Sequence, residues 1–377
     1  MNPVKSTPFQ LPRIPHPCRV AVIGGGINGI MTAWALQYAG CSVELFERGH
    51  LMSATSSAST KLLHGGLRYL ENGEFRLVRE ALHERAWWIA QAPHVAHPLQ
   101  LILPVYGWSR RSRYTVGLGL GLYGLLAGGH ALGPSRWHSR EALLRLQPDL
   151  CADDLRGGFS FYDGQMDDHA LGLWAAEQAI AAGVRVHENT PIERITADGG
   201  VITASGRQAF DQVVNVAGPW AVRLLTLSDI PCGHTLDLVR GSHLIINRPC
   251  PTGMLAEVRD ERRVAFILPW KGRTLVGTTE VRQTLEDEPA CSTAERDYLL
   301  AFHNRMLRTP AVASDISDTF AGIRPLLRSA DDASRATREY AIEDHGQIIS
   351  VFGGKWTTAR ALGQQVAKLV LKKTIRC

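Results

Sequence analysis

The chain has 377 residues, of which 45% are hydrophobic and 20% are charged, and its formal net charge is +5 at pH 7. A chain of this length can bury one large core or two adjoining ones, so two domains are expected. The basic excess is small and no basic run alternates with aromatic residues, which argues against a nucleic-acid-binding protein. Seven cysteines occur without a closely spaced pair, which indicates a reducing compartment and predicts no metal site.

The chain begins with a proline-rich stretch, residues 1–17, that contains no apolar core. This composition is typical neither of a signal peptide nor of a membrane span, and we expect a flexible arm. Behind it, residues 20–23 form an apolar strand that leads into a glycine turn at 24–29, a helix and a second strand at 42–46. Strand, turn, helix and strand in this order predict the first unit of a dinucleotide-binding fold.

The glycine turn has the chemistry that a pyrophosphate needs. Gly24 allows a tight turn, Gly26 allows the backbone to approach a phosphate, and Gly29 brings helix and strand together. The N-terminus of the helix offers unpaired N–H groups and a partial positive charge to an anion. Glu47, after the second strand, suits the hydroxyl groups of an adenosine ribose and argues against a 2′-phosphate, and hence against NADP. A structural glycine turn is the alternative interpretation.

The next segments predict helices and a second βαβ-like unit. Residues 76–92 predict an amphipathic helix, and residues 169–182 predict another helix, followed by a strand at 184–186. Between them, residues 114–132 carry no formal charge. Because glycines in that segment weaken a spanning helix, we expect a helix packed on the protein's own core, with a bilayer-contacting hairpin as the alternative.

The second half of the chain changes towards antiparallel patterning. Short strands are expected at 192–196, 201–203 and 213–216, and the last one leads to Gly218, where the backbone has to pass close to a cofactor. Residues 233–320 predict an antiparallel sheet. Its expected strands are 242–246, 264–268 and 274–277.

The end of the chain returns to the earlier pattern, with a strand at 348–352 and a helix at 361–376. Basic residues on this helix could meet anionic lipid, but a solvated face is the simpler interpretation. The predicted fold class is α/β with an α+β insert, that is, a Rossmann-like domain built from discontinuous segments and a mainly antiparallel substrate domain. The assigned segments are 18–76, 148–232 and 318–377 for the cofactor domain, 77–147 and 233–317 for the substrate domain, and 1–17 for the arm.

Several strings of residues resemble those of one enzyme family. Residues 56–70 read SSASTKLLHGGLRYL, and further strings lie at 215–220, 240–243, 268–270, 277–279, 322–326 and 352–358. In these strings and their order, over about residues 19–371, the chain resembles the FAD-dependent glycerol-3-phosphate dehydrogenases within the D-amino-acid-oxidase-like group of flavoproteins. The resemblance implies a flavoenzyme that holds FAD.

The resemblance also implies which residues hold the cofactor. The glycine turn would bind the pyrophosphate, and the segment from Ser56 to Gly66 would wrap the flavin. A helix N-terminus near the pyrimidine end of the flavin would stabilise the negative charge that grows there on reduction. The expected contacts are Gly24, Gly26, Ile27, Asn28, Gly29, Glu47, Arg48, Ser56, Ser57, Thr60, Lys61, Leu63, His64, Gly65, Gly66, Ile192, Ala217, Gly218, Trp220, Gly322, Arg324, Gly354, Lys355, Trp356 and Thr357.

The substrate residues that the resemblance implies are mainly basic. Arg68 and Arg324 would hold a phosphate dianion, since two guanidinium groups can bind its oxygens in defined directions. Lys355, beside the flavin, would steer the substrate alcohol or polarise its oxygen. Arg338 is a further candidate, equally well explained by a surface ion pair.

Two histidines compete for the role of general base. An imidazole can take the alcohol proton near neutral pH while the C2 hydrogen leaves as hydride to flavin N5. His64 is the first candidate because it lies in the matched string at 56–70. His243 is its competitor.

The implied reaction is the oxidation of sn-glycerol 3-phosphate to dihydroxyacetone phosphate, with electrons passed to a membrane quinone. The expected location is the cytoplasm, with peripheral contact to the inner face of the cell membrane as an option. One alternative is a related FAD oxidoreductase or oxidase that acts on another phosphorylated or acidic hydroxy or amino compound. A second alternative is a non-catalytic flavin-binding interaction protein.

The sequence departs from the family in two places. Met31 stands where the family usually has another small residue, which affects helix packing and leaves the three glycines of the turn intact. The chain also ends after the helix that follows Lys355, where longer bacterial enzymes continue into a helical C-terminal domain. This second departure leaves the oligomeric state, membrane docking and substrate range open.

Overall fold

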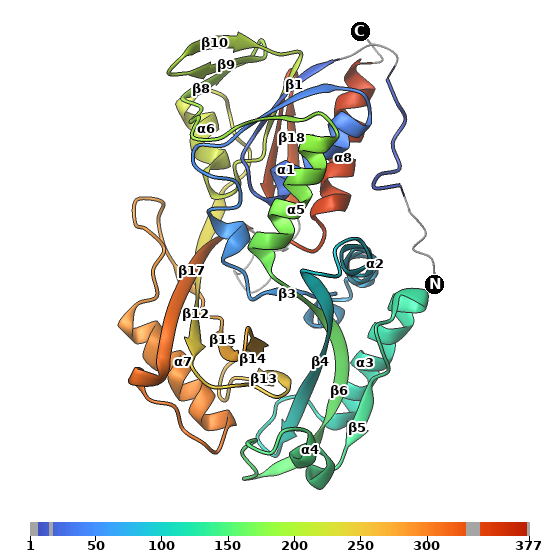
Figure 1. Ribbon diagram of the computed structural model, residues 1–377, viewed down its shortest axis with the longest axis vertical. Coiled ribbons are helices and arrows are strands. Elements are labelled where there is room, and N and C mark those ends of the chain that lie inside the picture. The colour runs from blue at the N-terminus through green and yellow to red at the C-terminus, as the bar shows by residue number, and fades with distance from the viewer. Residues whose placement is uncertain (1–6, 15–17, 329–339, 375–377) are drawn as a thin grey trace.

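Two regions of the protein lie one above the other along its long axis (Figure 1). A computed structural model describes residues 7–14, 18–328 and 340–374. The upper region contains a six-stranded sheet in which five strands are parallel, and the lower region contains a ten-stranded sheet that is mainly antiparallel. The predicted fold class, α/β with an α+β insert, is confirmed.

The six-stranded sheet has the strand order β18-β19-β11-β1-β2-β7. Its members are β1 (Arg19–Ile23), β2 (Ser42–Phe46), β7 (Arg185–His187), β11 (Gln212–Asn215), β18 (Tyr340–His345) and β19 (Ile348–Gly353). Successive residues of β1 point to opposite faces, so Val20 and Val22 pack into one buried cluster while Ala21 and Ile23 pack into another. Because both faces are buried, the central strands are continuous apolar runs.

Helices cover one face of this sheet, where α1, α5 and α8 lie together (Figure 1). Their bounds are α1 (Ile27–Tyr38), α5 (Asp168–Ala181) and α8 (Ala359–Thr374). The helices α1 and α8 approach closely at Met31, because a Cβ at Gly363 would lie only 2.7 Å from the Met31 backbone. The other face packs against α6 (Ala221–Leu227) and a small sheet of β8 (Arg194–Thr196), β9 (Gly200–Thr203) and β10 (Gly206–Ala209).

The ten-stranded sheet has the path β16-β12-β15-β14-β13-β4-β6-β3, with β17 beside β12 and β5 beside β6. Its strands are β3 (Leu62–Leu63), β4 (Ala96–Tyr106), β5 (Arg136–His138), β6 (Leu155–Met166), β12 (Leu236–Ile246), β13 (Gly253–Glu257), β14 (Val264–Trp270), β15 (Arg273–Gly277), β16 (Val281–Arg282) and β17 (Ile316–Leu327). The helices of this region are α2 (Phe75–Gln91), α3 (Arg113–Ala127), α4 (Arg140–Leu146) and α7 (Thr293–Met306). Short 3-10 helices are η1 (Thr55–Ser57), η2 (Leu67–Asn72), η3 (Gly128–His130), η4 (Gly218–Trp220) and η5 (Ala313–Asp315).

The strands expected at 242–246, 264–268 and 274–277 lie within β12, β14 and β15, and all pair antiparallel as predicted. Sheet membership departs from the predicted division of the chain at β3, β6 and β17. All three lie largely in stretches assigned to the cofactor domain, 18–76, 148–232 and 318–377, yet all three belong to the ten-stranded sheet. The reason is long-range pairing, since β6 runs along β4 and β17 along β12 over nearly their full lengths.

The predicted flexible arm is wrong for its described part, residues 7–14. Phe9 is buried and contacts Trp34 edge-on, with 5.3 Å between ring centroids. The Pro8 carbonyl accepts a hydrogen bond from Arg360 of α8 at 2.9 Å. An aromatic side chain among prolines therefore provides enough apolar contact to anchor this stretch. The remaining arm residues, 1–6 and 15–17, lie outside the described residues.

The uncharged segment at 114–132 forms α3 and η3. Val116, Leu120 and Tyr123 are buried, so this helix packs on the protein's own core as predicted and does not form a hairpin. The opposite face of α3 exposes large apolar side chains, which are Tyr114 at 72%, Leu118 at 77% and Leu125 at 76%. Of the described helices, none combines the length and the apolar character needed to cross a bilayer.

Candidate active site

The glycine turn between β1 and α1 is a tight backbone crossing. Gly24 has a φ of 115°, and a Cβ there would lie 2.5 Å from the Val216 carbonyl oxygen. A Cβ at Gly29 would lie 1.8 Å from the carbonyl oxygen of Gly24, so helix and strand can approach only without a side chain. At the N-terminus of α1, the Ile27 N–H donates to the Ser56 hydroxyl at 3.1 Å. This helix end is the predicted anion site.

Glu47 follows β2 and stabilises the glycine turn by hydrogen bonding. Its carboxylate accepts hydrogen bonds from the N–H groups of Gly25 at 2.6 Å and Gly49 at 2.9 Å. These contacts fix the carboxylate beside the glycine turn and leave lone pairs that could accept from the hydroxyl groups of an adenosine ribose. Arg48, the next residue, stacks on Trp220 with 3.7 Å from guanidinium carbon to ring centroid. Both residues line the adjoining cavity.

A cavity of about 700 Å³ extends from the turn to the ten-stranded sheet. Most predicted cofactor residues line it, namely Gly24, Gly26, Ile27, Asn28, Glu47, Arg48, Ser56, Thr60, His64, Gly66, Ile192, Ala217, Gly218, Trp220, Gly322, Arg324, Gly354, Lys355, Trp356 and Thr357. The buried Oδ1 atom of Asn28, at the start of α1, has no hydrogen-bond partner within the described chain. Three features fit a dinucleotide such as FAD. They are the unsatisfied Oδ1 atom of Asn28, the glycine turn suited to a pyrophosphate, and the Glu47 carboxylate suited to a ribose.

Five predicted cofactor residues do not line the cavity. They are Gly29, Ser57, Lys61, Leu63 and Gly65. Lys61 is buried and its Nζ donates to Asp168 and to the Ser57 carbonyl, both at 2.6 Å. The segment at 56–66 thus presents only part of its residues to the cavity. Its other residues anchor it to the protein.

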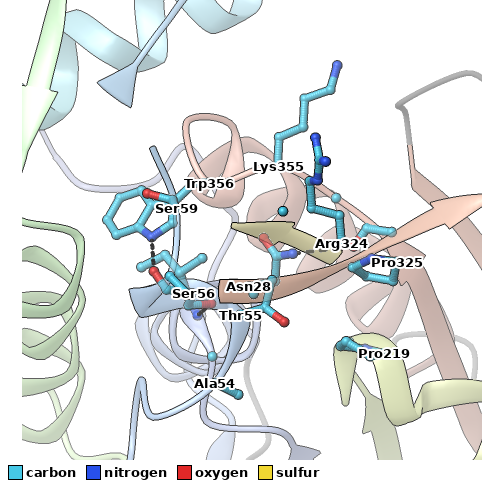
Figure 2. A pocket seen from close by; sticks show the side chains of 18 of the residues that line it. Asn28, Ala54, Thr55, Ser56, Ser59, Pro219, Arg324, Pro325, Lys355 and Trp356 are labelled. Carbon is cyan, nitrogen blue, oxygen red and sulfur yellow. Dashed lines mark hydrogen bonds between the residues drawn. The ribbon is translucent and has the colours of Figure 1, made fainter. Parts of the chain in front are cut away.

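The candidate substrate residues come together from distant parts of the chain. Arg68 of η2, Arg324 of β17 and Lys355 after β19 all line the cavity. In the view of Figure 2 the side chains of Arg324 and Lys355 extend in the same direction, while the Trp356 indole turns towards Ser56, to whose carbonyl it donates at 2.9 Å. Three cationic side chains on the wall of one cavity give it positive charge, which an anionic ligand would complement. Arg338 lies outside the described residues.

The two candidate bases differ in burial. His64 is half-buried, and both histidines line the cavity. His243 is 2% exposed, and its Nε2 lies 3.0 Å from the Thr60 hydroxyl. Burial, followed by the nearby charges of Arg324 and Lys61, lowers the pKa of His243 to about 3. A buried imidazole with a lowered pKa accepts a proton only weakly, so burial, and not position in the cavity, makes His64 the better candidate for proton exchange.

Among the cavity residues that sequence reasoning missed, two contact the predicted cations. Tyr69 is nearly buried, and its ring lies under Lys355 with 3.9 Å from Nζ to the ring centroid. Glu280 places a carboxylate oxygen 3.5 Å from Arg324. Tyr69 belongs to the matched string at 56–70, so the resemblance could have indicated it. Glu280 follows the matched string at 277–279, and only the fold brings it to Arg324.

Comparison with known proteins gives the family. The family model described as FAD dependent oxidoreductase (DAO) matches residues 19–369. The chain belongs to this family. The predicted resemblance is confirmed, and FAD is the cofactor that the cavity residues fit.

Several relatives carry the name glycerol-3-phosphate dehydrogenase. The Synechocystis protein is 35% identical over 94% of this chain and 70% of its own length. The Pseudomonas aeruginosa protein is 36% identical over 92% of this chain and 70% of its own length. The glycerol-3-phosphate dehydrogenase from Bacillus halodurans, solved with FAD, superimposes with a TM-score of 0.75 at 26% identity and covers 95% of this chain. The chain spans 65% of that protein and 61% of glycerol-3-phosphate dehydrogenase 2 from Mycobacterium tuberculosis.

Proposed function

We propose that this FAD-dependent oxidoreductase converts sn-glycerol 3-phosphate into dihydroxyacetone phosphate. When bound, FAD supplies a hydride acceptor at N5 for the C2 hydrogen of the substrate. Arg68 and Arg324 bind the phosphate through charge-assisted hydrogen bonds. Lys355 orients the C2 alcohol and stabilises its oxygen as the proton leaves, and His64 takes that proton.

One observation carries this proposal above all others. Arg68, Arg324 and Lys355 belong to three segments that are far apart in the sequence, yet they line one cavity beside the cofactor turn. A small dianion is the kind of substrate that several converging cations recognise, whereas an amino acid needs a carboxylate site and an uncharged environment for its amine. The names of the relatives agree with this assignment.

The test is reduction of the bound flavin without oxygen. Glycerol 3-phosphate added to the purified yellow holoprotein is expected to bleach the flavin absorption, with dihydroxyacetone phosphate formed in equal amount. Glycerol and glycine serve as controls that lack the phosphate. Bleaching by an amino acid or an unphosphorylated hydroxy acid alone would replace the proposed substrate, and a flavin that no substrate reduces would indicate a non-catalytic binding protein.

We further propose that the electrons pass to a membrane quinone and that α3 contacts the lipid. The exposed side chains of Tyr114, Leu118 and Leu125 form an apolar stripe on this helix. On its opposite face, Tyr123 accepts a hydrogen bond from the N–H of Gly65 at 2.8 Å, so α3 lies directly behind the segment that lines the cavity. An interfacial helix in this position would bring the cofactor site close to a lipid-dissolved acceptor.

Vesicle sedimentation tests this contact. Leu118→Glu is expected to reduce binding to phosphatidylglycerol-containing vesicles, because a charged group on the stripe opposes insertion. Ile180→Glu, at a position on α5 that is 50% exposed, is the matched control and should bind as the wild type does. Equal vesicle binding of both variants would contradict a contact between α3 and the membrane. Electron transfer from the reduced flavin to oxygen, and not to a quinone analogue, would indicate an oxidase.

A further inference from the structure

Arg324 is held by a short loop that follows β15. Its Nη2 donates to the carbonyl oxygen of Thr279 at 2.9 Å, and its Nη1 lies 3.5 Å from the carboxylate of Glu280. The two contacts differ in character, since Glu280 is 38% exposed and charged while the Thr279 carbonyl is neutral. A neutral acceptor orients a guanidinium without neutralising the charge that an anionic substrate needs.

Thr279 is itself fixed on both sides. Its side chain is nearly buried, and its hydroxyl donates to Glu295 at 2.6 Å while it accepts from the N–H of Ser242 at 2.8 Å. Its own N–H donates to the Ser242 carbonyl at 3.3 Å. Because side chain and backbone are both tied to β12, the carbonyl that receives Arg324 has a single direction.

Glu295 anchors this arrangement from α7. It forms a capping box with Ser292 and also accepts from the Ser242 hydroxyl at 2.8 Å and from Arg240 at 2.6 Å. Burial raises the pKa of Glu295, but hydrogen bonds from Arg240, Thr279, Ser292 and Ser242 together lower it to about 2. A carboxylate with this many donors stays ionised and immobile.

We infer that Glu295 is a positioning residue for the substrate phosphate, because through Thr279 it fixes the carbonyl that orients Arg324. Neither Glu295 nor Thr279 lines the cavity, whereas Arg324 does, so both act through the guanidinium and not by touching the substrate. The inference rests on the proposed function in one respect, namely that Arg324 meets the phosphate. It adds the device that sets the direction of this guanidinium.

The first experiment removes only the hydroxyl of Thr279. Thr279→Val is expected to raise the KM for glycerol 3-phosphate about tenfold with kcat changed less than about twofold, the size of one lost hydrogen bond. Thr279→Ser keeps the hydroxyl and should restore KM. Thr274→Val is the matched control, because Thr274 is a buried threonine of β15 whose hydroxyl donates to the Arg248 carbonyl. An unchanged KM in Thr279→Val, or an equal rise in Thr274→Val, would overturn the inference.

A double-mutant cycle separates positioning from general stability. In an Arg324→Ala background, Thr279→Val should have no further effect on KM, since the group it positions is gone. Additive effects of the two substitutions would contradict the inference. Glu295→Gln tests the anchor itself and should raise KM in the wild type but not in the Arg324→Ala background. If Glu295→Gln does not fold, the Thr279 variants still decide the question.

Inorganic phosphate distinguishes failure of the inference from failure of the proposed function. Phosphate binding is read from the perturbation of the flavin absorption spectrum, without turnover. If glycerol 3-phosphate does not bleach the flavin but phosphate binds about tenfold more weakly to Thr279→Val than to the wild type and to Thr279→Ser, the positioning stands and only the substrate is wrong. If glycerol 3-phosphate bleaches the flavin and phosphate binds all three proteins equally, the positioning is wrong and the substrate stands.

Discussion

The cofactor turn and the substrate end of the cavity are built in opposite ways. At the turn, Gly24 and Gly29 lie five positions apart in the sequence, and the contact between them excludes any side chain. At the proposed substrate end, Arg68, Arg324 and Lys355 line the cavity from distant segments, and we propose that they act through charge. The turn therefore depends on volume and the substrate end on charge and direction. A change in one should leave a recognisably different defect from a change in the other.

The largest effect is expected from adding one methyl group at the turn. Gly29→Ala places a Cβ where the Gly24 carbonyl oxygen lies, 1.8 Å away, so the crossing has to open and FAD should be lost, together with much of the fold. Gly121→Ala is the matched control on the exposed side of α3, where a Cβ meets nothing within 4 Å. It should retain FAD and gain about 0.5–1 kcal/mol of stability. Flavin content and thermal unfolding measure both. A Gly29→Ala protein with full flavin content would refute a volume-limited turn.

The next largest effect is expected at the buried ion pair between Lys61 and Asp168. Lys61→Met leaves Asp168 buried without its cation, and the loss of one partner of such a pair costs about 3–5 kcal/mol of unfolding free energy. Lys271→Met breaks the neighbouring pair with Asp167, in which the lysine is 61% exposed, and should cost less than about 1 kcal/mol. Urea unfolding measures both values. Equal losses would show that burial of the Lys61 pair does not matter.

Removal of one guanidinium should damage binding and spare the fold. Arg324→Ala is expected to raise the KM for glycerol 3-phosphate about 100-fold, the size of two lost charge-assisted hydrogen bonds, while flavin content stays near that of the wild type. Arg273→Ala, on β15 and outside the cavity lining, is the control. Steady-state kinetics and flavin absorbance check the result. An unchanged KM would remove Arg324 from the phosphate site.

The smallest effect at neutral pH concerns acid stability, because this effect appears only as the pH falls. The pKa of His243 is lowered to about 3, first by burial and then by Arg324 and Lys61, against 6.5 for an ordinary histidine. Between these values the unfolded chain binds a proton that the folded chain does not, so stability is fully present above pH 6.5 and falls as the pH drops towards 3. His243→Asn should lose less stability over this range in urea unfolding at several pH values. Parallel curves for both proteins would show that His243 titrates normally.

The accuracy of sequence reasoning within the segment at 56–66 varies from residue to residue. Ser56, Thr60 and His64 line the cavity as expected, whereas Lys61 and Leu63 face away from it. Neighbouring residues of β3 point to opposite sides, so Leu62 lines the cavity while Leu63 joins the core. A matched string identifies the segment, but only backbone direction decides which of its side chains reach the cofactor.

The sequence by itself determined the cofactor turn, the α/β class and the family. These features depend on residues that are near neighbours in the chain, so glycine spacing and apolar periodicity are enough to predict them. Tertiary structure alone decided that β6 joins the ten-stranded sheet, that residues 7–14 pack on α1 and α8, and that Glu280 and Thr279 meet Arg324. Such contacts join residues far apart in sequence, and their partners are chosen by strand pairing and burial, which no local pattern encodes.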